Sequence, residues 1–323
     1  MAATARHAER VLSVLRDGAA PALSPVAASW RRCLTQHHLD PENRKPPETL
    51  TGPELRAARE QLGGLLLAAQ DNLDALFQAV GDAGCCVLLT NADGVPVDRR
   101  GMAGDDAVFR RWGLWEGAVW SEASEGTNGI GTCITEQRVL TIHRDQHFHT
   151  RNIGLSCTVS PLFDAGGRLA GALDVSSCRP GLEGVTGLVE RAVTDAARRI
   201  EARAFRETFP GARIVLLPET GAERASAPML AVDGDDLVIG ATRAARLALK
   251  LTDEAIKRGL PSPDRSADLA SHGLGGAERA AVRRALSQAG GNVSAAAALL
   301  GLSRATLHRR MKRLDLTRDR EFH

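Results

Sequence analysis

The sequence predicts an α+β fold in which an antiparallel sheet domain is followed by a small all-α domain. Short apolar runs that end in turn residues alternate with helical stretches between residues 81 and 205, a pattern typical of an antiparallel sheet with interspersed helices. Leucines recur at helical spacing from Pro53 to Val80, which predicts a long helix before the sheet. We divide the chain into an N-terminal helical region, the sheet domain, a shorter mixed segment with a linker, and the helical domain: residues 1–80, 81–205, 206–272 and 273–323.

The expected strands of the sheet domain are separated by turn sequences. Cys85 to Thr90 is an apolar run, and the Asn91-Ala92-Asp93-Gly94 sequence after it is typical of a turn. Residues 155–163 and 169–175 flank a second turn at 164–167, which predicts a hairpin. The remaining expected elements of this domain are a second strand at 95–97, a strand at 139–143 and a helix at 185–206.

Residues 206–272 predict two strands and a helix. Met229 to Val232 and Leu237 to Gly240 are apolar and flank the acidic turn Asp233-Gly234-Asp235-Asp236. A helical pattern follows from Ala241 to Leu251. Prolines at 261 and 263 and glycines between 273 and 276 then predict a linker before the last domain.

Composition and charge narrow the class of protein. No apolar run is long enough to span a membrane, and Met1 to Arg16 lacks the pattern of a signal peptide. The six cysteines form no CxxC pair, which indicates reduced, buried thiols. The net charge is only +2, but residues 273–323 carry ten Lys or Arg against four Asp or Glu, an excess of six. We therefore expect a cytoplasmic protein with a polyanion partner at this end, and no membrane partner, cofactor, metal ligand or catalytic residue.

The densest pattern lies between Ala277 and Leu316. A helix ending at Gln288 is followed by Gly290-Gly291, by a very short Ala-rich helix, and by a tight turn at Gly301. The third helix has an apolar inner face, and five cations lie unopposed by any acid between Ser303 and Arg313. Two small helices joined by a tight turn, with a cationic third helix, predict a helix-turn-helix that contacts DNA phosphates and bases. The alternative is a protein-interaction module with a solvated basic face. The inner-face residues are Leu307, Met311 and Leu314.

The same residues resemble the Fis-type helix-turn-helix found at the end of many bacterial enhancer-binding activators. The resemblance covers about forty residues, from Gly-Gly-Asn-Val-Ser-Ala-Ala-Ala at 290–297 through Leu-Gly-Leu-Ser-Arg-Ala-Thr-Leu at 300–307 to Arg-Arg-Met-Lys at 309–312. It implies a homodimer on a partly palindromic double-stranded site, with two residues near phosphate and the others on the groove side or on phosphates. The predicted DNA-binding residues are Asn292, Ser294, Ser303, Arg304, Thr306, His308, Arg309, Arg310, Lys312 and Arg313.

A second motif lies in the sheet domain. Trp120-Ser121-Glu122 and the glycine-rich run Glu125 to Thr132 fit neither GxGxxG nor GxxxxGK[ST], so the glycines indicate a tight turn before a helix rather than a phosphate loop. With Leu155-Ser156-Cys157, Gly171 to Ser176 and Ser29-Trp30-Arg31-Arg32-Cys33, this run resembles the GAF-type sensor domain of AcoR-like activators. The resemblance covers about residues 25–200. Those activators regulate the catabolism of acetoin and related alcohols.

The resemblance implies that the domain binds a small effector, such as an alcohol, an aldehyde or a related metabolite. In GAF-type domains the pocket lies between the sheet and its covering helices. By position, the predicted effector-binding residues are Trp120, Thr127, Asn128, Cys133, His147 and Cys157. A structural role in the core is the competing interpretation for each of them. The stretch Gly240 to Arg246 resembles part of a PAS-like segment in the same group.

One feature departs from AcoR-like activators. They carry an ATPase domain of more than 200 residues between the sensor and the helix-turn-helix, and this chain has no room for one there. The sequence contains neither GxxxxGK[ST] nor the GAFTGA loop that contacts the sigma-54 form of RNA polymerase. We therefore expect regulation by DNA occupancy or by recruitment, without ATP hydrolysis.

Three other functions remain open from the sequence. The chain could be a co-regulatory or architectural DNA-binding protein without a ligand, in which the GAF-like and PAS-like parts only mediate dimerisation. It could be a redox or metal sensor, through Cys85-Cys86 or through His143, His147 and His149 with Cys157. An enzyme with a DNA-binding tail is disfavoured, because no nucleophile, base and orienting group are clustered in the sequence.

Overall fold

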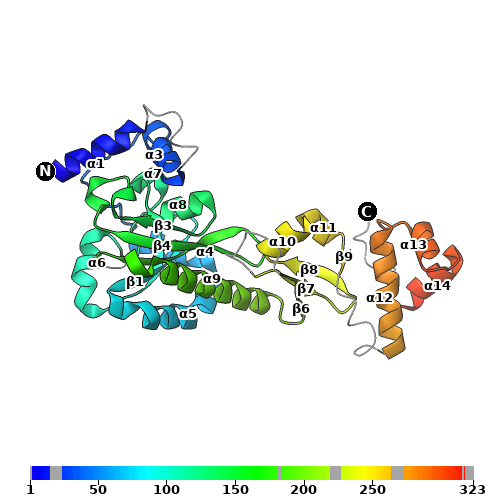
Figure 1. Ribbon diagram of the computed structural model, residues 1–323. Helices are drawn as coiled ribbons and strands as arrows, with labels where there is room; N and C mark the ends of the chain where they lie inside the picture. The colour runs from blue at the N-terminus through cyan, green and yellow to red at the C-terminus, as the bar shows by residue number, and fades with distance from the viewer. Residues whose placement is uncertain are drawn as a thin grey trace. The chain divides into compact units, whose positions relative to one another are not determined.

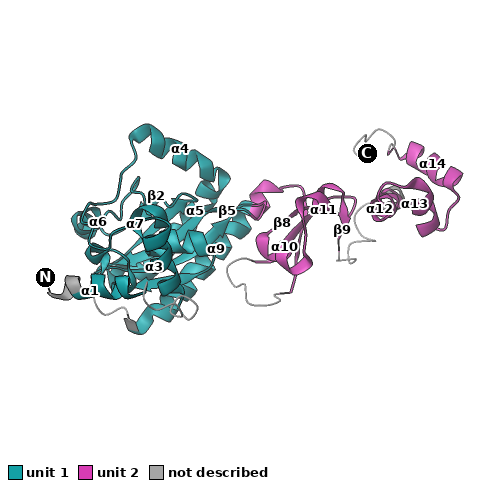
Figure 2. Ribbon diagram, turned by 90° about the horizontal axis from the view of Figure 1, so that it is seen from above, with its two compact units in different colours: residues 1–164, 168–204 teal, residues 165–167, 205–323 magenta. Residues whose placement is uncertain are grey.

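The computed structural model describes residues 2–14, 24–179, 183–218, 227–262, 273–314 and 316. The chain divides into two compact units, one formed by residues 1–164 and 168–204, the other by residues 165–167 and 205–323 (Figure 2). Among the helices that are described, none combines the length and apolarity needed to cross a membrane. Each unit has its own apolar core and is described separately.

The first unit contains a five-stranded antiparallel sheet with the order β2-β1-β5-β4-β3 (Figure 1). The predicted hairpin is present, since β4 pairs with β5 around the turn at 164–167. The side chain of Asn91 forms the other predicted turn by accepting from the backbone N–H groups of Asp93 and Val95, and Gly94 there has a φ of 78°. The strands are β1 (Cys85–Asn91), β2 (Pro96–Arg100), β3 (Leu140–His143), β4 (Ser156–Phe163) and β5 (Leu169–Ser177).

Long helices cover one face of this sheet. Leu73 and Leu76 pack with Val87, Leu89 and other strand residues in a single buried cluster. The prediction of one helix from Pro53 to Val80 is wrong, because two helices meet at Gly63, whose φ of 50° interrupts the helical path. The helices on this face are α4 (Gly52–Leu62), α5 (Gly64–Val80) and α9 (Thr186–Thr208), and the short helix η1 (Gly81–Ala83) leads into β1.

Short helices and loops cover the other face. Phe109, Trp120 and Ile130 pack there against Cys86 and Leu88 of β1. A small neighbouring cluster joins the N-terminal helices to the Phe148 loop. The elements are α1 (Ala2–Ser13), α3 (Pro25–Thr35), η2 (Ala103–Asp105), α6 (Asp106–Trp112), α7 (Glu122–Glu125), α8 (Gly129–Glu136), η3 (Arg144–Gln146) and η4 (Thr150–Asn152). The short helix η5 (Glu183–Val185) leads into α9.

The second unit begins with a four-stranded antiparallel sheet in the order β6-β7-β8-β9. Leu230, Val232 and Val238 form its core with Ala245 of the following helix. The predicted strand, turn, strand and helix are all present, although the helix starts two residues later than Ala241. The elements are β6 (Arg213–Leu216), β7 (Met229–Val232), β8 (Leu237–Ala241), α10 (Arg243–Leu249), α11 (Asp253–Lys257) and β9 (Leu260–Pro261). Whether this segment is related to PAS domains stays a prediction.

Three helices complete the second unit: α12 (Gly273–Gln288), α13 (Val293–Leu299) and α14 (Arg304–Arg313). The first starts four residues before the predicted Ala277. Val282 and Leu286 of α12 pack with Leu307 and Met311 of α14 in a small core of their own. The predicted order of two small helices and a third amphipathic one is confirmed, as is the α+β class of the whole chain.

Large aromatic side chains are unevenly distributed between the units. All four tryptophans, Trp30, Trp112, Trp115 and Trp120, lie in the first unit, and the chain contains no tyrosine. Trp120 is buried and donates from Nε1 to the carbonyl of Gly113 at 2.8 Å. The guanidinium groups of Arg99 and Arg110 lie 4.1 and 3.6 Å from the ring centroid of Trp115. The second unit contains no tryptophan.

Candidate DNA interface and effector region

Polar caps fix the start of the last two helices. The side-chain oxygen of Asn292 accepts from the backbone N–H groups of Ser294 and Ala295 at 3.0 and 3.1 Å. Ser303 caps α14 by accepting from the N–H of Thr306 at 3.1 Å, and the two hydroxyl groups lie 2.8 Å apart. Two of the predicted DNA-binding residues, Asn292 and Ser303, therefore have structural roles at helix starts. Their contacts with DNA stay a prediction.

The third helix presents two different faces. Leu307 and Met311 are buried in the helical core, as the amphipathic pattern predicts. Ser294, Ser303, Arg304, His308, Arg309, Lys312 and Arg313 are exposed. The cations therefore lie on the side of α14 that faces away from the domain core, where a polyanion can approach them.

An acid on the first helix of this domain neutralises part of the basic face. Glu278 of α12 contacts Arg310 of α14 at 3.1 Å through one carboxylate oxygen and Arg313 through the other. The sequence-based expectation of unopposed cations is therefore wrong for these two residues, because it considered only acids within the third helix. Within the part of the chain that is described, Arg304, Arg309 and Lys312 form no ion pair.

The cations of α12 are also paired. Arg283 contacts Asp235, and Arg284 contacts Asp236 at 2.7 Å, both acids lying in the turn between β7 and β8. Arg279 lies 3.5 Å from Asp235. The acidic turn therefore neutralises the cations of α12, and the charge available to a polyanion in this domain is concentrated on α14.

The glycine-rich motif of the first unit forms a turn and a helix cap. Asn128 accepts from the N–H of Gly131 at 2.8 Å and so caps α8. Its amide nitrogen donates to the carbonyls of Gly126 and Trp120 at 2.8 and 3.1 Å. Two of the predicted effector-binding residues, Asn128 and Trp120, thus use their polar atoms within the protein. This geometry favours the structural interpretation for both.

A buried network joins two motifs that are far apart in sequence. The hydroxyl of Ser29 donates to Glu122 at 2.7 Å and lies 2.6 Å from the hydroxyl of Thr127. Arg32 binds the other oxygen of Glu122 at 2.8 Å. Sequence reasoning placed Thr127 in the pocket but missed Glu122 and Arg32, although both lie within the quoted motifs. The contacts between these side chains depend on how α3 packs over α7. A local sequence pattern does not predict that packing.

Histidine and thiol groups fill the centre of this face. His147 is fully buried, which lowers its pKa to about 4, and its Nε2 lies 3.5 Å from the sulfur of Cys157. Burial raises the pKa of the Cys133 and Cys157 thiols well above the usual range. These three predicted effector-binding residues are therefore neutral groups packed in the core.

The redox and metal alternatives find little support in this geometry. Burial raises the pKa of Cys85 to about 11 and also raises the pKa of Cys86 well above its usual value, which disfavours the thiolate that a redox sensor needs. Among the described residues, no group of three or more His, Cys, Asp or Glu side chains is placed to hold a metal ion.

Sequence reasoning missed a buried carboxyl group beneath α8. Asp174 of β5 is fully buried, and burial raises its pKa to about 7. One of its oxygens, Oδ2, accepts from the hydroxyl of Ser176 at 2.7 Å, while Oδ1 has no hydrogen-bond partner. The strand pattern held the clue, because Leu173 and Val175 face the long helices and the acid between them must face the other way.

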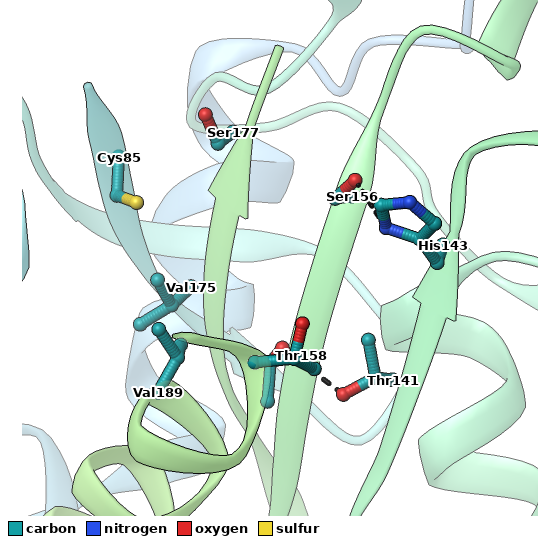
Figure 3. A pocket seen from close by; sticks show the side chains of 9 residues that line it. Cys85, Thr141, His143, Ser156, Thr158, Val175, Ser177 and Val189 are labelled. Carbon is teal, nitrogen blue, oxygen red and sulfur yellow. Dashed lines mark hydrogen bonds between the residues drawn. The ribbon is translucent and has the colours of Figure 1, made fainter. Parts of the chain in front are cut away.

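A pocket lies on the opposite face of the same sheet, beside α9 (Figure 3). It encloses about 310 Å³ of space, including the part open to solvent. Thr141 and Thr158 lie 3.1 Å apart in it, and Ser156 contacts His143 at 2.8 Å. None of the predicted effector-binding residues lines this pocket. Its lining residues are Cys85, Thr141, His143, Ser156, Thr158, Val175, Ser177, Thr186 and Val189.

Comparison with protein families matches both parts of the chain. A model of the GAF domain matches residues 65–203, which include the five-stranded sheet and most of its long helices. A model described as "Bacterial regulatory protein, Fis family" matches residues 275–314, which include α13, α14 and most of α12. The chain therefore carries a GAF domain and a Fis-type helix-turn-helix.

Known proteins with a similar sequence are named as regulators. The acetoin catabolism regulatory protein of Cupriavidus necator is 39% identical over 181 residues, 56% of this chain and 27% of that protein. The acetoin dehydrogenase operon transcriptional activator AcoR of Bacillus subtilis is 27% identical over 225 residues, 69% of this chain and 36% of that protein. The predicted resemblance to AcoR-like regulators is confirmed. The chain spans about a third or less of the length of these two relatives.

The fold has a counterpart among solved structures. The crystal structure of the E. coli DhaR(N)-DhaL complex contains a chain that matches with a TM-score of 0.51 and 15% identity. The match covers 71% of this chain and 76% of that one. At this level of identity the likeness concerns the fold. The relatives named above are regulators and activators, which agrees with the prediction that the chain is not an enzyme.

Proposed function

We propose that this chain is a transcriptional regulator that binds double-stranded DNA through α13 and α14. The observation that carries the proposal is the exposed set of Arg304, Arg309 and Lys312, which form no ion pair in the described part of the chain. They lie on a helix whose other side is buried within a Fis-type helix-turn-helix. Cations in this position bind phosphates, and residues near the helix start reach base edges.

We further propose that the regulator acts in the cytoplasm as a homodimer on a partly palindromic operator. The helix-turn-helix geometry supports this, because two copies related by a two-fold axis place their reading helices about one DNA turn apart, roughly 34 Å. Regulation proceeds by occupancy or recruitment, since the sequence of this chain carries no GxxxxGK[ST] motif for ATP hydrolysis. Light scattering of the full chain, free and on DNA, measures the oligomeric state.

The GAF domain supplies the regulation in this proposal. It binds a small effector, such as an alcohol, an aldehyde or a related metabolite, and so biases the operator affinity of the chain. The names of the relatives support this class of effector, because two of them are regulators of acetoin catabolism or of an acetoin dehydrogenase operon.

A gel shift tests the DNA-binding proposal. The full chain is titrated on DNA from its own promoter region, at several salt concentrations, beside Arg304→Ala and Arg309→Ala. Each substitution is expected to weaken binding by about tenfold and to reduce the salt dependence. Arg191→Ala is the matched control, because Arg191 is an exposed arginine of α9 in the first unit. Absence of sequence-selective binding at every salt concentration would contradict the proposal.

One observation favours a second candidate function. All six predicted effector-binding residues are buried, and none of them lines the pocket of Figure 3. The GAF domain would then organise a dimer without binding a ligand. Thermal unfolding with added metabolites separates the two functions, because a ligand that binds only the folded state raises the unfolding temperature.

A further inference from the structure

Trp115 holds two guanidinium groups against its ring at the surface of the first unit. The guanidinium carbon of Arg110 lies 3.6 Å from the ring centroid, and that of Arg99 lies 4.1 Å from it. Arg110 belongs to α6 and is exposed, while Trp115 is partly exposed in the loop after this helix. A guanidinium group that stacks on an aromatic face keeps the N–H groups at its edge free to donate. Arg110 is therefore held in place with donors available to a partner in solution.

The arginines of this surface outnumber the acids that can neutralise them. In the part of the chain that the structure describes, Arg110 and the neighbouring Arg111 form no ion pair, and both are exposed. Each acid between residues 101 and 116 is paired with another arginine. These pairs are Asp105 with Arg179 at 2.7 Å, Asp106 with Arg99 at 2.9 Å and Glu116 with Arg59 at 2.7 Å. Two positive charges are therefore left without a counter-charge on α6.

A third cation lies behind the ring of Trp115. The side chain of Arg99 is 8% exposed, and its Nε and Nη2 atoms are buried without an acceptor in the described part of the chain. The ion pair with Asp106 involves Nη1, and the Asp106 side chain is itself 36% exposed. A buried cation whose donors are only partly used adds positive potential at the nearby surface and favours an anion there.

The side chains around the two free arginines indicate a protein partner rather than a nucleic acid. Trp112 and Trp115 are partly exposed, and Met102, shortly before α6, is 49% exposed. Protein–protein interfaces are enriched in Trp, Met and Arg, and Trp and Arg contribute most often to their hot spots. Two free charges match a short acidic segment, whereas proteins that bind nucleic acids neutralise a longer series of phosphates.

We propose that Arg110, Arg111 and Trp115 form a docking surface for an acidic segment of a partner protein. Arg110 binds one carboxylate through two parallel hydrogen bonds, the geometry that a planar guanidinium group shares with a carboxylate. An apolar side chain of the partner packs beside Trp115. The surface goes beyond the proposed function, because it needs neither DNA nor an effector. It gives a regulator that acts by recruitment a place to hold another protein.

Selection from a random peptide library displayed on phage tests the chemistry of the partner. The full chain is the bait, and the double variant Arg110→Ala/Arg111→Ala removes peptides that bind elsewhere. We expect the enriched peptides to carry Asp or Glu next to an apolar residue. Replacing these acids by Asn or Gln in the best synthetic peptide should weaken binding at least about tenfold, the value of one hydrogen bond to a charged group. Enriched peptides without acids, or no enrichment over the double variant, would overturn the proposal.

Single variants assign the contact to Arg110, with fluorescence anisotropy of the dye-labelled peptide as the measurement. Arg110→Ala should weaken binding at least about tenfold. Arg110→Lys should recover little of this loss, because an ammonium group cannot form the two parallel hydrogen bonds of a guanidinium group. Arg191→Ala, at an exposed arginine of α9, is the control and should leave binding unchanged. Full recovery by lysine, or an equal loss in the control, would show non-specific charge attraction and overturn the docking geometry.

A gel shift separates the docking surface from the DNA-binding helices. Arg110→Ala/Arg111→Ala should bind promoter DNA as the unsubstituted chain does, with the same salt dependence. A loss of DNA affinity as large as that of Arg304→Ala would show that these arginines bind phosphate, and would overturn the class of partner. If the unsubstituted chain binds acidic peptides but no DNA, the proposed function is wrong and the docking surface stands.

Discussion

Charged side chains have opposite roles in two regions of this chain: acids are buried in one region, and cations are exposed in the other. In the GAF region Glu122, Glu125 and Asp174 are buried at exposures of 4% or less. In the helix-turn-helix, Arg304, Arg309 and Lys312 are exposed. A charge in the core acts on folding, because it depends on partners inside the protein. A charge on the surface acts on binding, because its partner comes from solution and competes with salt.

The largest expected effect concerns the pH dependence of folding. The pKa of Asp174 is raised to about 7 in the folded state, so the folded chain holds a proton that the unfolded chain releases near pH 4. The free energy of unfolding contributed by this group is therefore highest at low pH and falls as the pH rises from about 4 to 8, by on the order of 4 kcal/mol. In Asp174→Asn this fall should be absent.

Urea unfolding at several pH values measures that effect. Burial lowers the pKa of His147 and His149 to about 4, so these two groups change stability in the opposite direction between pH about 4 and 6.5. The comparison is therefore the difference between the variant and the unsubstituted chain at each pH, with the exposed Asp82→Asn as control. An equal difference at pH 5 and pH 8 would show that Asp174 has an ordinary pKa.

The next effect is the loss of a buried ion pair. Glu122→Gln removes the charge that binds Arg32 and weakens the acceptor for Ser29. We expect the free energy of unfolding to fall by about 3 kcal/mol, the lower end for a broken buried pair, because Arg32 keeps its contact with Glu136. Chemical denaturation measures it beside Glu190→Gln, an exposed glutamate of α9. A change below that of the control would mean that the pair contributes little.

A pair of glycine substitutions tests how closely α8 packs on the sheet. Gly129→Ala places a methyl group 2.5 Å from Cβ of Cys157 and 2.8 Å from Cγ2 of Val159, so it should destabilise the fold by about 1–3 kcal/mol. Gly187→Ala in α9 meets no atom within 4 Å and should stabilise by up to about 1 kcal/mol. Thermal unfolding of both variants measures whether each substitution raises or lowers the stability of the fold. A stability change in the same direction in both variants would contradict the described packing.

The smallest expected effect concerns the exposed region. Glu278→Gln releases Arg310 and Arg313 from their ion pairs on the DNA-binding domain. DNA affinity should rise about two- to fivefold, and the salt dependence should steepen by about one phosphate contact. A gel-shift salt titration measures both quantities, with Glu190→Gln as control. Unchanged binding would show that these two arginines do not reach DNA.

Local sequence patterns were sufficient to predict much of the fold. The Asn91 to Gly94 turn, the β4–β5 hairpin and the three C-terminal helices follow from turn residues, period-two runs and caps, each of which acts within about ten residues of sequence. The interruption at Gly63 was missed, because a glycine inside a helical pattern is usually tolerated, and the sequence alone does not show that this glycine adopts a φ of 50°.

The sites were predicted less completely than the fold. Ser303 and Asn292 could be identified as caps, but the contacts of Glu278 join residues more than thirty positions apart. The free oxygen of Asp174 depends on what surrounds the strand in three dimensions. Sequence motifs name the residues of a core, and only the assembled structure shows which of their polar atoms remain without a partner.

The distribution of tryptophan gives the molecule a built-in optical label. Because Trp30, Trp112, Trp115 and Trp120 all belong to the first unit and there is no tyrosine, the intrinsic ultraviolet fluorescence of the chain comes almost entirely from that unit. Emission reports on the GAF region during unfolding or titration, while the helix-turn-helix is silent. A dye on duplex DNA reports on the other end, so the two halves can be followed at different wavelengths in one cuvette, without labelling the protein.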